Sequence, residues 1–233
     1  MKESENFLFS LHTWWYNLPM IIQHYEKVKE QLHGATLCIV SKKRSLEEIM
    51  SYYEAEERVF GENHAKELVE KAKQLPKDIQ WHFIGHLQRN KVKDILPYVS
   101  MIQSLDNMAL AQVIEKEVSK MNKQIDVLVE FHLAEDDLNK TGLAKDEAIP
   151  FITQCLNLKH IHIKGIMVMG PHTDDEEKIA SVFEEANQLF HQIRETFPEE
   201  DIRILSMGMS DDYPIALAHG STMVRIGTYL FEE

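Results

Sequence analysis

Two short segments near the C-terminus combine small residues with hydroxyl groups. They read SMGMS at 206–210 and RIGT at 225–228, and each lies at the end of a short apolar run. Glycine leaves backbone N–H groups accessible and serine or threonine adds a hydroxyl donor, so loops of this kind can bind a phosphate group. Glycine and serine also favour ordinary turns. The two segments therefore indicate a phosphorylated ligand, and a pair of plain turns is the alternative.

A lysine at the end of an apolar run supplies a candidate nucleophile. Lys42 follows the run TLCIVS at 36–41, where partial desolvation would leave more free amine to attack an aldehyde. Opposite a phosphate-binding loop, such a lysine points to Schiff-base chemistry. A lysine that simply leaves the core for solvent has the same sequence surroundings, so position alone leaves both interpretations open.

Apolar runs that alternate with longer amphipathic segments must position these residues. The alternation is typical of βα units and a mainly parallel sheet. The sequence contains eight such runs, at 36–41, 58–61, 80–84, 101–104, 125–132, 161–169, 202–206 and 223–226. The helical patterns lie between them, at 45–55, 63–75, 88–96, 107–121, 145–157, 174–196 and 211–219. We therefore predict the α/β class and a single TIM-type (β/α)8 barrel, with an open doubly wound sheet as the alternative.

The barrel prediction places the candidate residues in one site. Side chains just past the C-terminal ends of the strands converge on one rim of such a barrel, and phosphate sites frequently follow strands seven and eight. Because the sequence ends soon after the eighth run, we expect a helix within 17–33 to cover the barrel where a final helix is missing. No linker-like segment divides the sequence. Residues 1–233 are thus predicted to form one domain, with 1–16 as an N-terminal extension.

The composition argues against several classes of function. The formal charge is −13, from 25 basic and 38 acidic side chains, which disfavours the phosphate-backbone contacts of nucleic-acid binding. The two cysteines give neither a disulfide framework nor a metal-binding pair, and the N-terminus is a poor signal peptide. No stretch approaches the roughly 20 apolar residues of a membrane span. We expect a cytoplasmic protein without nucleic-acid or membrane partners.

Six motifs occur in the order found in one protein family. They are VSK at 40–42, FGEN at 60–63, WHFIGHLQRNK at 81–91, KTG at 140–142, SMGMSDD at 206–212 and GSTMVRIGT at 220–228. They resemble the pyridoxal-phosphate homeostasis protein family. The resemblance implies the barrel of the fold-type III pyridoxal-phosphate proteins, without the second β domain of alanine racemases. It also implies a monomer that carries or buffers pyridoxal 5′-phosphate for vitamin B6 and amino-acid homeostasis, with apo-forms of enzymes that use this cofactor as partners and no dedicated turnover.

The resemblance assigns roles to individual residues. Lys42 would form the Schiff base, and Arg225 would face the pyridine nitrogen. Because a guanidinium stays charged and can only donate hydrogen bonds, it would disfavour protonation of that nitrogen and leave the ring a weak electron sink. The phosphate would be held by Ser210 and by the backbone of Gly227 and Thr228. The pocket wall would include Asn63, Ser206 and Met209.

Three segments depart from the family pattern. Lys42 is followed by KRS where a Thr-Lys-Pro-like sequence is common, and the fifth run reads VEFHLAEDD where an asparagine is usual. The C-terminus, YLFEE, lacks the glycine that commonly follows the phenylalanine. None of these changes replaces a proposed phosphate ligand, so we expect cofactor binding to be retained.

Three other functions stay open as alternatives. An amino-acid racemase needs a second acid or base on the ring face opposite the lysine, and Tyr229 and His86 are the nearest candidates. A zinc site could draw on the histidine pairs at 82 and 86 or at 160 and 162, although neither pair has an evident third ligand. The acidic segments at 54–57 and 174–177 could dock a partner, but charge runs are usually solvated helix faces.

Overall fold

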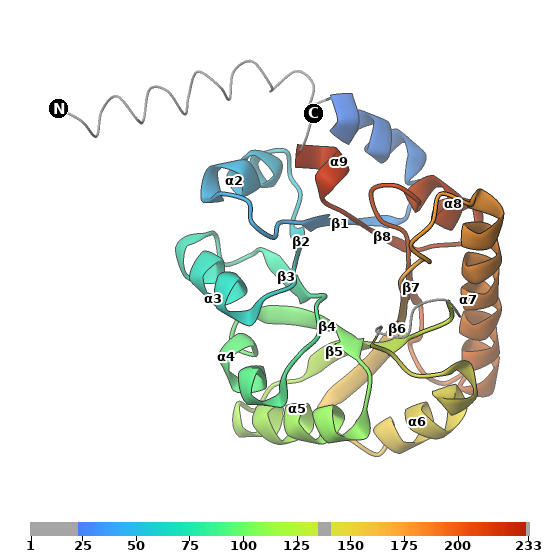
Figure 1. Cartoon of the computed structure of the whole chain (residues 1–233). Coiled ribbons are helices and arrows are strands. Elements are labelled where there is room, and N and C mark those ends of the chain that lie inside the picture. Colours follow the sequence, from blue (N-terminus) through green and yellow to red (C-terminus); the bar gives the residue numbers. More distant parts are fainter. Residues whose placement is uncertain (1–22, 135–140, 232–233) are drawn as a thin grey trace.

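Eight parallel strands close into one barrel with the helices outside it (Figure 1). The computed structural model describes residues 23–134 and 141–231. In chain order around the barrel the strands are β1 (Thr36–Val40), β2 (Val59–Glu62), β3 (Gln80–Phe83), β4 (Val99–Leu105), β5 (Ile125–Phe131), β6 (Ile161–Val168), β7 (Ile204–Ser206) and β8 (Met223–Ile226). Because β8 pairs in parallel with β1 and closes the ring, the predicted TIM-type (β/α)8 barrel is confirmed and the open sheet is wrong.

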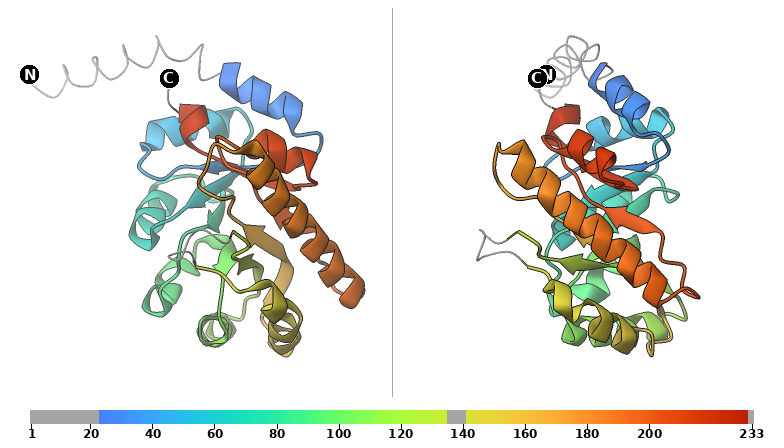
Figure 2. Two further views of the ribbon diagram at one scale, coloured as in Figure 1. Left: turned by 45° about the vertical axis from the view of Figure 1, so that its right-hand side comes forward. Right: turned by 90° about the vertical axis from the view of Figure 1, so that its right-hand side faces the viewer.

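Helices cover the outside of the barrel. They are α2 (Leu46–Glu54), α3 (Ala65–Gln74), α4 (Val92–Ile95), α5 (Met108–Lys120), α6 (Ala148–Cys155), α7 (Glu176–Thr196), α8 (Tyr213–Ala218) and α9 (Thr228–Phe231). The 3-10 turns η1 (Arg89–Lys91) and η2 (Lys145–Glu147) precede α4 and α6. The segments predicted as single helices at 88–96 and 145–157 therefore each begin with a 3-10 turn, which is common at helix N-termini. Figure 2 shows α7 running along one flank of the barrel.

Alternation along the strands separates the outer core from the barrel interior. In β1, Leu37 and Ile39 belong to the large apolar cluster between the strands and the helices. Successive side chains of a strand point to opposite faces, so Cys38 and Val40 face the interior. A separate apolar cluster fills the interior on the side of β4 to β6, and its members are Met101, Leu128 and Met167.

The helix at 23–31, here called the N-terminal helix, completes the outer ring beside α8 and α9 (Figures 1 and 2). Val28 is fully buried against the barrel. Gln31 accepts a hydrogen bond from the Tyr213 hydroxyl of α8 at 2.6 Å, and His24 stacks on Tyr229 of α9 with ring centroids 4.4 Å apart. The predicted covering helix is confirmed for these residues. The rest of that prediction, 17–22, and the extension 1–16 lie outside the described residues.

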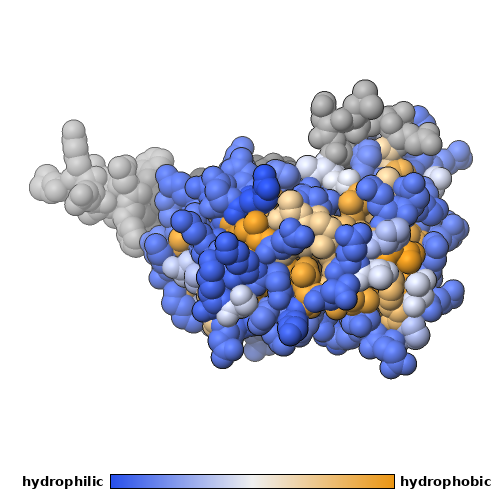
Figure 3. Space-filling model, turned by 90° about the horizontal axis from the view of Figure 1, so that it is seen from below, coloured by the Kyte–Doolittle hydropathy of each residue, from blue (hydrophilic) through white to orange (hydrophobic). Residues whose placement is uncertain are grey.

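The described surface is largely polar, with local apolar areas. Among the described residues, no helix combines the length and the apolar content that crossing a bilayer requires. Figure 3 shows the face over α4, α5 and α6, where hydrophobic residues gather between hydrophilic ones. Met209 is the one large hydrophobic residue of the described chain that counts as exposed, at 39%. It lies in the loop after β7, at the end of the barrel where the sequence predicts the site.

Candidate functional site

All eight predicted site residues lie on one arc of the barrel rim. Closure of the barrel sets β8 between β7 and β1, and β2 lies on the other side of β1. The eight residues occupy the C-terminal ends of these four neighbouring strands: Ser206 ends β7, Met209 and Ser210 follow it, Arg225 lies in β8, Gly227 and Thr228 follow β8, Lys42 follows β1 and Asn63 follows β2. The fold therefore brings together residues from both ends of the chain.

Hydrogen bonds connect the loops after β7 and β8. The backbone N–H of Tyr229 donates to Ser210 Oγ at 3.1 Å, and the backbone N–H of Arg225 donates to the Gly208 oxygen at 2.9 Å. Gly208 has a φ of +95°, and a Cβ there would lie 2.6 Å from a side chain of α8, so the loop requires glycine at this point. These contacts hold the Ser210 hydroxyl beside the first residues of α9.

Two features of the rim leave space and hydrogen-bonding capacity for a ligand. A Cβ added at Gly227 would lie 3.0 Å from the Val40 oxygen, so any side chain here would crowd the junction of β8 and β1. Asn63 Oδ1 is buried and has no hydrogen-bond partner among the described residues. Because a buried acceptor without a partner costs about 1–3 kcal/mol, a donor on a ligand that reaches Asn63 would stabilise the site.

Arg225 is a buried cation in the barrel interior, with only 4% of its surface exposed. Its Nη1 donates to the Ser206 oxygen at 2.9 Å and to Ser206 Oγ at 2.8 Å, and its Nη2 donates to the Val168 oxygen at 3.0 Å. Within the described part of the chain, no carboxylate forms an ion pair with it. Burial lowers the pKa of Arg225, but a guanidinium starts from a pKa above about 12 and stays charged. The site thus contains a fixed positive charge without a bonded counter-ion.

A chain of hydrogen bonds, here called the inner relay, holds Arg225 through Ser206, Gln103 and His82. Ser206 Oγ donates to Gln103 Oε1 at 2.7 Å, and Gln103 Nε2 lies 2.9 Å from His82 Nδ1. Burial lowers the pKa of His82 to about 4, so the ring is neutral and its Nδ1 accepts the amide proton. Each hydrogen bond of the relay therefore runs away from the guanidinium, from Arg225 to Ser206, from Ser206 to Gln103 and from Gln103 to His82.

Sequence reasoning placed only two members of the inner relay in the site. Gln103 was missed, and His82 was considered only as a zinc ligand. Both lie in strands that also carry apolar core residues, at positions whose side chains alternate with those outward-facing residues. A polar side chain at an inward position of a predicted barrel strand was the signal that could have found them.

Lys42 lies in a turn beyond β1 and is exposed, so the predicted partial desolvation of its amine is wrong for this structure. The turn is closed by a hydrogen bond from the Arg44 N–H to the Ser41 oxygen at 3.0 Å. Ser41 is fully buried and points outward, where its Oγ donates to Glu62 Oε1 at 2.7 Å. Lys42 is the first residue after this anchored position and lies on the rim, at the C-terminal end of β1.

The rim opposite this arc is acidic. Glu130 of β5 is 3% exposed and accepts a hydrogen bond from Thr141 Oγ1 at 2.6 Å. Burial raises the pKa of Glu130. Nearby, Asp106 Oδ2 lies 3.7 Å from His86 Nδ1. Carboxyl groups therefore line the rim across from Lys42 and Arg225, and one further carboxyl group, that of the buried Asp212, lies on the arc itself in the loop after β7.

The residues considered for a racemase or a zinc site do not meet on this arc. The ring of Tyr229 stacks on His24 of the N-terminal helix, outside the barrel. The His86 side chain is 56% exposed beside Asp106, whereas His82 is buried in the inner relay. The described residues contain no group of three His, Cys, Asp or Glu side chains that could hold a metal ion.

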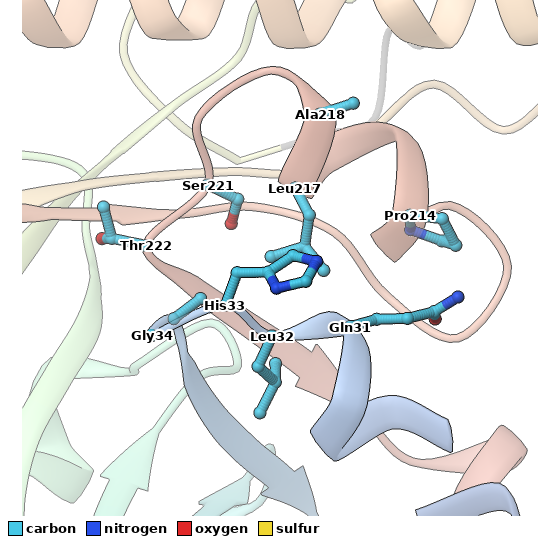
Figure 4. A pocket seen from close by; sticks show the side chains of 10 residues that line it. Gln31, Leu32, His33, Gly34, Pro214, Leu217, Ala218, Ser221 and Thr222 are labelled. Carbon is cyan, nitrogen blue, oxygen red and sulfur yellow. The ribbon is translucent and has the colours of Figure 1, made fainter.

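A cavity of about 600 Å³ lies at the other end of the barrel (Figure 4). The end of the N-terminal helix and α8 form its walls, with Leu32 and Leu217 among the lining residues. Its lining also includes Ala35 and Thr222, which immediately precede β1 and β8. The cavity therefore lies at the N-terminal ends of the strands, away from the eight predicted residues, and it is not the site predicted from the sequence.

Comparison with known proteins places this barrel in the class of alanine racemase N-terminal domains. Residues 16–233 match the family model of the alanine racemase N-terminal domain. At lower identity, lysine/ornithine decarboxylase from Vibrio vulnificus shares the fold, with a TM-score of 0.68 and 18% identity over 90% of this chain and 61% of that chain.

Relatives of higher identity define the family. The pyridoxal phosphate homeostasis protein of Pasteurella multocida is 35% identical over 216 residues, which is 90% of this chain and 91% of the relative. The protein of the same name from Helicobacter pylori is 37% identical over 204 residues, 86% and 89% of the two chains. PipY of Synechococcus elongatus, solved without its cofactor, superposes with a TM-score of 0.86 at 30% identity, covering 91% of this chain and 99% of PipY. The chain belongs to the pyridoxal phosphate homeostasis protein family.

Proposed function

We propose that this chain binds pyridoxal 5′-phosphate on the β7–β8–β1–β2 arc and carries or buffers it for vitamin B6 and amino-acid homeostasis. The observation that carries the proposal is Arg225, a buried guanidinium without a bonded carboxylate at the centre of the predicted site. A buried charge without a counter-ion is expensive, so a ligand that accepts a hydrogen bond from it is stabilised. A structure of the related PipY with this cofactor bound superposes with a TM-score of 0.83 at 29% identity.

The chemistry of the arc fits the two ends of the cofactor. Ser210 and the backbone N–H groups of Gly227 and Thr228 hold the phosphate, where the glycine keeps the strand junction open. Arg225 donates to the pyridine nitrogen. Pocket-wall contacts come from Asn63, Ser206 and the exposed side chain of Met209, whose thioether packs well against a flat ring.

Lys42 would hold the aldehyde end of the cofactor, because its amine nitrogen can bond to an aldehyde carbon while the aldehyde oxygen leaves as water. When bound, the cofactor supplies an electron sink, and its strength depends on protonation of the ring nitrogen. Arg225 carries only donors and keeps that nitrogen unprotonated, so this chain restrains the reactivity of what it binds.

A carrier role is favoured over a racemase because the second acid or base that racemisation needs has no suitable candidate on the arc. The ring of Tyr229 faces the N-terminal helix, and His86 lies across the rim. Measurable racemisation of alanine or other amino acids at low protein concentration would overturn this part of the proposal.

The remaining parts of the proposal concern organisation and partners. Residues 1–233 form one domain that acts as a monomer in the cytoplasm. Apo-forms of enzymes that use pyridoxal phosphate receive the cofactor from it. A labelled cofactor that moves from this chain to such an apo-enzyme faster than it is released into buffer would support direct transfer.

The visible absorption spectrum tests the site. After incubation with pyridoxal phosphate and desalting, we expect the wild type to retain the absorption of a Schiff base and Lys42→Ala to lose it. Lys43→Ala is the matched control, because it changes the neighbouring exposed lysine, and it should retain the band. Identical spectra for the wild type and Lys42→Ala would show that the assignment of Lys42 is wrong.

A further inference from the structure

A buried group of charges lies beneath α3, on the outer side of β1 and β2. The side chain of Lys71 is only 7% exposed. Its Nζ donates to Glu62 Oε1 and to Glu67 Oε1, both at 2.7 Å, and to the backbone oxygen of Ser41 at 2.5 Å. An ammonium group has three protons to donate, so its donors are fully used. We call Glu62, Glu67 and Lys71 the α3 clamp.

The α3 clamp holds the chain on both sides of Lys42. Before Lys42, Ser41 is held through its backbone oxygen by Lys71 and through its hydroxyl by Glu62, at 2.7 Å. After it, the backbone N–H of Lys43 donates to Glu67 Oε1 at 2.5 Å. Both peptide groups that flank the proposed Schiff-base lysine are therefore anchored to the α3 clamp.

The turn that carries Lys42 is strained at its next residue. Lys43 has a φ of +62°, in the left-handed region that residues with a Cβ rarely adopt. Such a conformation persists where the surrounding structure holds it, and the hydrogen bond from the Lys43 N–H to Glu67 does so. A left-handed residue reverses the direction of the chain, so the conformation of Lys43 sets how the turn presents the two adjacent lysines.

We propose that the α3 clamp decides which of two adjacent lysines takes the cofactor, by presenting Lys42 to the rim and holding Lys43 away from it. The inference rests on the proposed function and adds Glu67 and Lys71 as positioning residues. Neither touches the cofactor. Without the clamp, Lys43 leaves the left-handed region, the turn relaxes, and both amines reach the rim. The bond changes are the same for either lysine, since each amine displaces one water from the aldehyde.

The position of a trapped cofactor tests the proposal. Each protein is incubated with pyridoxal phosphate, the Schiff base is reduced with sodium borohydride, and peptide mass spectrometry measures the modified fractions of Lys42 and Lys43. We expect modification almost exclusively at Lys42 in the wild type. In Glu67→Leu and Lys71→Met the ratio of Lys42 to Lys43 should fall about tenfold, which corresponds to about 1.4 kcal/mol.

Controls separate selection from general disturbance of the fold. Lys66→Met removes a lysine of α3 whose side chain is 88% exposed, and it should leave the ratio unchanged. If Lys71→Met fails to fold by circular dichroism, Glu67→Leu decides, because Glu67 lies nearer the surface with a side chain 24% exposed.

The outcomes distinguish this inference from the proposed function. If the wild type is modified only at Lys42 and folded Glu67→Leu keeps the same ratio, selection by the α3 clamp is wrong while the site stands. If the wild type is modified at neither lysine, the proposed site is wrong, and so is the inference that rests on it.

Discussion

The α3 clamp and the inner relay lie on opposite faces of the barrel wall, and each contains a buried cation. The two cations differ in the groups that accept their hydrogen bonds. Outside, Lys71 meets two carboxylates and a carbonyl oxygen. Inside, Arg225 meets a hydroxyl and two carbonyl oxygens, and the nearest acids, Asp212 and Glu130, act on it only through longer-range attraction. The α3 clamp pairs its cation with carboxylates of the protein, whereas the inner relay leaves a positive charge facing the site.

This difference indicates that the α3 clamp supports the fold and that the inner relay binds the ligand. Buried charges that are paired hold their neighbours in one geometry. Removing one partner leaves the other charge buried and unpaired. A buried charge without a bonded partner is preorganised for a group that is added later, since its donors are already oriented by the relay. The α3 clamp should therefore govern stability and the placement of Lys42, whereas the inner relay should govern affinity for the ligand.

The largest effect on stability should come from Lys71→Met. The change leaves Glu62, which is fully buried, without its cation, and removing one partner of a buried ion pair typically costs about 3–5 kcal/mol. Urea denaturation measures the free energy of unfolding. The exposed Lys66→Met serves as control and should change it by less than about 0.5 kcal/mol. A loss as small as that of the control would mean that the α3 clamp does not stabilise the fold.

The next largest effect is a pH dependence that originates in the inner relay. The pKa of His82 falls from 6.5 to about 4 because burial disfavours its charged form. Below pH 6.5 the unfolded chain takes up a proton that the folded chain does not, so stability present above pH 6.5 is lost as the pH falls towards 4. The loss is on the order of 3 kcal/mol.

His82→Gln isolates this contribution. Glutamine cannot take up a proton, and its carbonyl oxygen can still accept from Gln103. Urea denaturation of both proteins between pH 7 and pH 4 should show a smaller decline for the variant. Parallel curves for the two proteins would mean that His82 is not the group responsible.

Arg225→Met should reduce the affinity for the cofactor more than it reduces the stability of the fold. The variant loses a charged hydrogen bond to the ring nitrogen, worth about 1.5–3 kcal/mol, which is roughly a 10- to 100-fold rise in the dissociation constant of the cofactor. Absorbance titration measures this constant. Arg203→Met is the control, because its side chain is 68% exposed, and it should bind as the wild type does. If Arg225→Met destabilised the fold as much as Lys71→Met, the contrast between the two clusters would fail.

The two clusters also differ in how far the sequence could predict them. The barrel followed from the alternation of apolar runs and helical patterns, and strand ends converge once the barrel is known. Gln103 was missed because β4 reads VSMIQSL, with three polar residues, and only the closed barrel shows that the glutamine faces inward. Lys71 was missed because a lysine near the end of an amphipathic helix usually faces solvent. Its burial depends on Glu62 and Ser41 from other elements, which only the fold brings together.

The smallest expected effect on the free energy of unfolding comes from Lys43→Gly, which tests whether the α3 clamp maintains a strained turn. Lys43→Gly removes the Cβ from the residue at φ +62°, which relieves about 1–2 kcal/mol of strain. Glycine also gives the unfolded chain more freedom, which offsets about 0.5–1 kcal/mol of that gain. The net result should be a stabilisation of about 0.5 kcal/mol in urea denaturation. A clear destabilisation would mean that the Lys43 side chain itself contributes to the turn, and that the left-handed conformation is not maintained by Glu67 alone.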